Sequence, residues 1–198
     1  AGLEILEDLG WDPPDAIFVS VGDGSIIGGL HKAVKDALAL GWIERAPRIF
    51  GVQSEGSDYL VQAFESGEDV LTKPPISATT VADSISADLP RDRIKAMAAV
   101  TETGGAYLRV SDDEILAAIP VLARGSGVFA EPAGAAALAG LVAAADRGLV
   151  DDSDEVVLVA TGNGLKDIPS ALKAVTAAGT EPVRIDPDLD SLKTAINH

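Results

Sequence analysis

Residues 16–29 read Ala-Ile-Phe-Val-Ser-Val-Gly-Asp-Gly-Ser-Ile-Ile-Gly-Gly, an apolar run followed by four glycines in eight positions. The apolar run at 16–21 predicts a strand that is buried on both faces. Residues 22–29 predict a loop whose glycines let backbone N–H groups converge on an anion, because no Cβ stands in the way. A helix expected from Leu30 to about Leu40 adds its positive N-terminal end. The stretch predicts a phosphate-binding loop, with an ordinary strand-to-helix turn as the alternative.

Strands and helices alternate along the rest of the chain. Further strands are expected at residues 48–52, 106–110 and 155–160, and helices at 3–9, 59–64, 94–101, 111–123 and 133–147. Nearly continuous apolar strands that alternate with helices predict an α/β fold with a parallel sheet covered on both faces. The helix at 133–147 is almost entirely apolar, so we expect it to be packed closely on both sides. We expect one α/β domain over residues 1–198, with a loosely packed tail from about residue 180.

Composition excludes several classes of protein. The chain has 198 residues, 47% of them hydrophobic, and no cysteine, so disulfides and thiolate metal sites are excluded and a cytoplasmic protein without a metal site is expected. No apolar run approaches the length of a membrane span. With 31 acidic and 15 basic residues, the formal net charge of −16 repels nucleic acid and anionic membranes.

The chain opens on Ala1 and enters a helix at once, which we interpret as the start of a fragment.

The acidic balance also suggests a halophilic source, because a highly charged surface stays hydrated in concentrated salt, where self-repulsion is screened. An ordinary acidic protein of the cytoplasm is the alternative.

The halophile hypothesis predicts a salt-dependent stability. The Debye length shortens from about 30 Å at 0.01 M salt to about 3 Å at 1 M, so the repulsion among the acidic residues is strongest in dilute buffer. We expect the Tm to rise steeply between low and molar KCl and to continue rising after screening saturates. Thermal melts over that range, with and without the expected ligand, measure the effect. A flat profile removes the halophile hypothesis.

Two further stretches supply candidate site residues. Thr161-Gly162-Asn163-Gly164 follows the last expected strand. These residues can form a simple tight turn, or they can direct the Thr161 hydroxyl at a ligand. Glu131 opens the apolar helix, where its charge suits the helix N-terminus and its carboxylate can also line a site.

A dinucleotide site is a weaker reading of the glycine loop. Gly22, Gly24 and Gly28 fit the spaced glycine pattern only loosely, although Glu55 lies near the position of the acid that would bind a ribose. The hypothesis that the protein is an NAD(P) oxidoreductase therefore depends only on this loop and Glu55. A P-loop is excluded, because no Lys-Ser/Thr pair follows the glycines.

The stretches at 9–15, 21–24, 51–56, 78–85, 131–135 and 161–167 occur in the order and at the spacing found in the threonine synthases. The chain resembles the C-terminal part of that family over nearly its whole length. The Glu131-Pro132-Ala133-Gly134-Ala135 motif is shared with the serine/threonine dehydratases, whereas the Thr161 turn is more specific. The resemblance implies pyridoxal phosphate (PLP) as cofactor, and an incomplete, three-layer, parallel-sheet large domain of a fold-type II enzyme similar to the tryptophan synthase β chain.

The resemblance also implies roles for particular residues. Gly22, Asp23, Gly24, Ser25 and Ile26 align with the family's loop for the cofactor phosphate, Thr161 aligns with the residue that hydrogen-bonds the pyridine nitrogen, and Glu131 and Asn163 are expected to line the site. Threonine synthases often have Asn where Asp23 and Ile26 stand. A carboxylate beside a phosphate is unfavourable, so we expect backbone contacts at the loop.

The family's Schiff-base lysine lies in the N-terminal half, and its motif does not occur in this chain. Lys166 follows Thr161 closely, but we expect it to be solvated or to cap a turn. No catalytic residue is therefore assigned, and the chain alone is expected to be inactive.

The resemblance implies a lyase of threonine biosynthesis that converts O-phospho-L-homoserine and water to L-threonine and phosphate. The expected partners are a phosphorylated amino acid, the N-terminal part of the same protein and a second copy in a homodimer. Two alternatives stay open, namely a serine/threonine dehydratase-like β-eliminase and a non-catalytic module that binds phosphate or a nucleotide.

Overall fold

The computed structural model describes residues 1–179 and 183–196. Within them, one sheet contains β1 (Ala16–Ser20), β2 (Arg48–Ser54), β3 (Tyr107–Val110) and β4 (Val156–Val159), in the order β3-β2-β1-β4. All neighbouring strands are parallel, and Ala16 pairs with both Arg48 and Val156. The chain thus builds outward from β1 to β3 and then crosses back to place β4 on the other side of β1.

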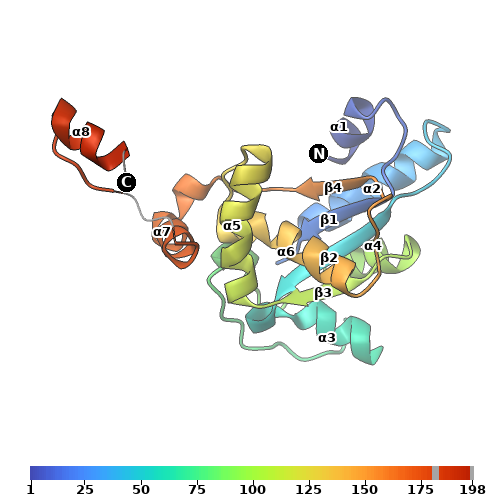
Figure 1. The fold of residues 1–198 in the computed structure, drawn as a ribbon. Coiled ribbons are helices and arrows are strands. Elements are labelled where there is room, and N and C mark those ends of the chain that lie inside the picture. The colour runs from blue at the N-terminus through green and yellow to red at the C-terminus, as the bar shows by residue number, and fades with distance from the viewer. Residues whose placement is uncertain (180–182, 197–198) are drawn as a thin grey trace.

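Helices cover both faces of the sheet (Figure 1). One face carries α2 (Ser25–Ala39), α3 (Tyr59–Ser66) and α4 (Arg93–Glu102), with α1 (Gly2–Asp8) packed on α2. The other carries α5 (Asp112–Ser126) and α6 (Pro132–Asp146), with α7 (Ile168–Ala177) packed on α5. A hydrophobic core lies on each face of the sheet, and successive residues of β1 point to opposite cores. Phe18 packs toward α5 and α6, and Val19 packs toward α2 and α4. The predicted three-layer α/β fold is confirmed.

The start of α2 differs from the prediction. The helix begins at Ser25, not at Leu30, so Gly28 and Gly29 lie inside it and the loop is shorter than 22–29. Gly24 takes the N-cap position with φ of +90°, which only glycine adopts readily, and so starts the helix early. The later glycines belong to a helix surface, where Gly28 allows close packing against Lys95 of α4.

Two other predictions concern helices on the opposite face. The capping box of α5 is confirmed, because Ser111 Oγ accepts from the Glu114 N–H and the Glu114 carboxylate accepts from the Ser111 N–H at 2.6 Å. The expectation that the apolar helix is packed on both sides is wrong for one stripe of α6. Most of α6 is buried, but Val142 is 54% exposed, because α5 and the sheet cover only part of its circumference.

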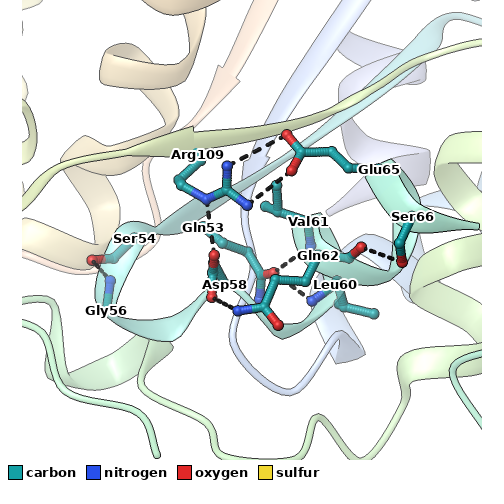
Figure 2. A network of polar contacts seen from close by, with 10 residues as sticks. All are labelled: Gln53, Ser54, Gly56, Asp58, Leu60, Val61, Gln62, Glu65, Ser66 and Arg109. Carbon is teal, nitrogen blue, oxygen red and sulfur yellow. Dashed lines mark hydrogen bonds and ion pairs between the residues drawn. The ribbon is translucent and has the colours of Figure 1, made fainter. Parts of the chain in front are cut away.

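Gln53 of β2 connects the end of β1 to the start of α3. Its side chain is fully buried, and its amide donates to the Val21 carbonyl at 3.1 Å. Its carbonyl accepts from the N–H groups of Leu60 and Val61 at 2.8 and 3.1 Å. Asp58, the N-cap of α3, makes no side-chain capping bond, so Gln53 supplies the cap from the neighbouring strand (Figure 2). Gln53 thereby fixes Val21, immediately before the glycine loop.

The C-terminal part ends in α8 (Leu189–Ile196), which buries no residue and lies away from the sheet (Figure 1). The loosely packed tail predicted from about residue 180 includes 180–182 and 197–198, which lie outside the described residues. No helix in the described part of the chain is long and apolar enough to span a membrane.

Candidate functional site

A cavity of about 420 Å³ opens at the carboxyl ends of β1 and β4. The strand order reverses between β1 and β4, because β2 and β3 lie on one side of β1 and the later strand β4 lies on the other, and open parallel sheets bind ligands at such a switch point. The cavity brings together most of the predicted site residues, which are Gly22, Asp23, Gly24, Ser25, Ile26, Glu131 and Thr161. The glycine loop and the Thr161 turn therefore face the same cavity, although they are far apart in sequence.

The N-terminus of α2 contributes backbone donors to this cavity. Gly24 is the N-cap and has no side chain to accept from the first amides of the helix. These amides and the positive end of the helix dipole favour an anion. A Cβ on Gly24 would lie 2.8 Å from the Ala96 Cβ, so the loop rests directly on α4.

The polar side chains of the loop are held by a neighbouring segment. The Asp23 carboxylate accepts from the Arg91 N–H at 3.4 Å, and the Ser25 hydroxyl donates to the Asp92 carboxylate at 2.7 Å. Hydrogen bonds from Lys95 and then Ser25 lower the pKa of Asp92. Backbone groups are thus the donors that the loop offers to the cavity, because its side chains bond elsewhere.

The start of α6 is joined to the turn after β4. Glu131 is the N-cap of α6, and its N–H donates to the Gly162 carbonyl at 2.9 Å. A Cβ on Gly162 would lie 2.0 Å from Glu131 Oε1, so the carboxylate occupies the space that the glycine leaves. This close approach places the buried Glu131 carboxylate beside Thr161.

Asn163 does not line the cavity. Its side chain accepts from the Leu165 N–H at 2.9 Å and caps a short 3-10 helix, η3 (Gly164–Lys166). The turn after β4 therefore contributes Thr161 and Gly162, while Asn163 shapes the turn itself.

Lys166 and Ser20 are lining residues that sequence reasoning missed. The Lys166 side chain is 60% exposed, in keeping with the expected solvated lysine, and its ammonium also lies 2.6 Å from Ser84 Oγ and 3.1 Å from Glu131 Oε2. The sequence signal that could have placed Lys166 at the cavity is its position five residues after Thr161. Ser20 ends β1 and is 5% exposed, and its hydroxyl has no partner among the described residues. For Ser20, the corresponding signal is a polar residue at the end of a buried strand, directly before the glycine loop.

An open parallel sheet with uncapped helix amides at its switch point is typical of α/β proteins that bind phosphorylated ligands. Residues 1–162 match the family of pyridoxal-phosphate dependent enzymes, and the chain belongs to this family. The parallel-sheet fold and PLP as the cofactor follow from that membership.

The predicted resemblance to threonine synthases is confirmed. The chain is 35% identical to the threonine synthase of Methanocaldococcus jannaschii, over 96% of this chain and 46% of that protein. It is 36% identical to the threonine synthase of Methanosarcina acetivorans, over 98% of this chain and 47% of that protein. The chain thus spans about half the length of these relatives. Processed threonine deaminase isoform 2 of Solanum lycopersicum shares the fold, with a TM-score of 0.70 and 24% identity over 90% of this chain and 48% of that one.

The residues of the cavity fit PLP. The unpartnered Ser20 hydroxyl is buried and costs free energy unless a ligand or water bonds it. The uncapped amides of α2 suit the cofactor phosphate, and a cavity of about 420 Å³ is large enough for a cofactor. Gly22 to Ile26 would hold the phosphate, and Thr161 would face the ring.

Proposed function

We propose that the protein containing this chain is a PLP-dependent lyase of the threonine synthase type, which converts O-phospho-L-homoserine and water to L-threonine and phosphate. The observation that carries the proposal is the single cavity that unites the uncapped start of α2 with the Thr161 turn. The identity of 33–38% to threonine synthases supports the assignment of the reaction.

When bound, PLP supplies the electron sink for cleaving bonds at the substrate's carbon atoms. The loop amides and the positive end of α2 bind its phosphate and fix its position. The Thr161 hydroxyl would face the ring nitrogen and, being neutral, would not hold a proton on that nitrogen as a carboxylate would. This environment favours elimination and replacement over transamination.

The lysine that binds PLP covalently is not assigned to this chain. Among the described residues, Lys166 is the one lysine that lines the cavity, and it is paired with Glu131. We propose that the covalent lysine belongs to another part of the protein, that this chain alone is inactive, and that the complete protein works in the cytoplasm as a homodimer.

Product analysis tests the proposed reaction. The complete protein with PLP is incubated separately with O-phospho-L-homoserine, L-threonine and L-serine. Formation of threonine with an equal amount of inorganic phosphate supports a synthase. Formation of 2-oxo acids from threonine or serine, without turnover of the phosphorylated substrate, supports the dehydratase alternative, which the fold of the Solanum deaminase also accommodates. Absence of PLP absorbance in the purified protein would favour a non-catalytic module.

Thr161→Val tests the role of the hydroxyl. The complete protein should retain PLP, and kcat should fall roughly tenfold to a hundredfold, as expected for the loss of one polar contact. Steady-state kinetics and the PLP absorbance spectrum measure the two effects. Thr101→Val is the control, because Thr101 is exposed on α4 and bonds only its own helix. Normal kcat in Thr161→Val would count against the role.

A further inference from the structure

Lys166 is the one basic side chain among the described residues that line the cavity, where the carboxylates of Asp23 and Glu131 are the acidic groups. The whole chain carries a net charge of −16. Once the amides of α2 hold the cofactor phosphate, the Lys166 ammonium is the positively charged side chain of the cavity that can attract the phosphate of a substrate.

The contacts of Lys166 fix its ammonium at the cavity. Ser84, in the 3-10 turn η2 (Asp83–Ile85), lies 2.6 Å from Nζ, and both carboxylate oxygens of Glu131 lie within 3.2 Å. The Glu131 side chain is 8% exposed, so one anchor of the lysine is buried. Two segments that are distant from Lys166 in sequence thus hold its ammonium group in place.

The ammonium keeps a donor for a ligand. A lysine has three N–H donors, and the described residues provide partners in two directions, at Ser84 and Glu131. The Lys166 side chain is 60% exposed, so an incoming anion can reach the third N–H without displacing either partner. The start of α6, with Ala133 in the cavity lining, adds the positive end of a helix nearby.

We propose that Lys166 is a specificity residue that binds the phosphate of the substrate, as distinct from the phosphate of the cofactor. The inference rests on the proposed function, which supplies a phosphorylated amino acid. A compact ammonium acts as a point charge and suits a phosphate dianion. Glu131 and Ser84 are then positioning residues, because they hold the ammonium toward the cavity.

The test measures binding of inorganic phosphate to the complete, PLP-loaded protein by calorimetry, so it does not depend on turnover. Lys166→Met should weaken phosphate binding by about tenfold to a hundredfold, the usual effect of losing one charged hydrogen bond. The KM for O-phospho-L-homoserine should rise by a similar factor, with a smaller change in kcat. PLP content and absorbance should stay unchanged, and Lys166→Arg should restore most of the phosphate affinity.

Lys35→Met is the matched control. Lys35 is 55% exposed and pairs with Glu102 at 3.0 Å, but it lies outside this cavity. The variant removes the same charge, so a nonspecific effect of net charge would weaken phosphate binding equally in both variants and would overturn the proposal.

Other outcomes are equally decisive. Unchanged phosphate affinity in Lys166→Met overturns the proposal, and so does loss of PLP, which would assign Lys166 to the cofactor site. If Lys166→Met does not fold, Lys166→Gln provides the same test, because its amide can still bond Ser84 and Glu131 without a charge. If the complete protein does not turn over O-phospho-L-homoserine but Lys166→Met still loses phosphate affinity, only the proposed function fails.

Discussion

Gly24→Ala should lower the free energy of unfolding by about 2–4 kcal/mol and weaken PLP binding. Gly24 has φ of +90°, where any side chain is strained, and its new Cβ would lie 2.8 Å from the Ala96 Cβ and 3.2 Å from the Asp92 carbonyl oxygen. Relief of this contact requires the loop to move away from α4, which displaces the amides that face the cavity. Chemical denaturation and PLP titration measure the two effects.

Gly29→Ala is the matched control with the opposite sign. Gly29 lies inside α2, and a Cβ there would have no atom within 4 Å. Alanine lowers the entropy of the unfolded chain and favours the helix, so stability should rise by about 0.5–1 kcal/mol with PLP affinity unchanged. Equal losses in both variants would show that the position and conformation of Gly24 do not matter.

Gln53→Leu should lower the free energy of unfolding by about 3–5 kcal/mol. Three buried backbone groups lose their partner, namely the Val21 carbonyl and the N–H groups of Leu60 and Val61 (Figure 2). Each group left unsatisfied costs about 1–3 kcal/mol, and some relax toward other partners. Because Val21 precedes the glycine loop, PLP affinity should fall as well. Denaturant unfolding and PLP titration of the variant measure both quantities.

Gln62→Leu provides the comparison within the same network. Gln62 is only partly buried and donates to the Asp58 carboxylate at 2.7 Å, while Arg109 also bonds that carboxylate at 2.8 Å (Figure 2). Asp58 therefore keeps a partner, and the loss should stay below about 1 kcal/mol. A loss as large as that of Gln53→Leu would contradict the special role assigned to the buried cap.

The sheet and the loop could be predicted because their signals are local. Apolar runs such as residues 16–19 mark buried parallel strands, and a glycine cluster after a strand marks a turn. The start of α2 could not be predicted as well, because composition does not distinguish a glycine that adopts positive φ, such as Gly24, from one that allows helix packing, such as Gly28.

The missed site residues depend on contacts between distant segments. Lys166 contacts Ser84 and Glu131, and the spacing of these residues in the sequence does not predict the contacts. The buried cap of α3 is similar, because Gln53 acts on Leu60 and Val61 from a separate strand. Periodicity predicts which face of an element is buried, but these roles depend on which elements become neighbours.

The position of β4 beside β1 has a consequence for the order of events during folding. Ala16 pairs with Val156, so this edge of the sheet closes a loop that contains most of the chain, and such contacts form slowly. Thr161 reaches the glycine loop only after β4 has docked. An assembly intermediate without β4 would contain the phosphate-binding half of the cavity but not the half that faces the ring. PLP should therefore bind tightly only to the finished fold, and by mass action it then protects that fold against unfolding.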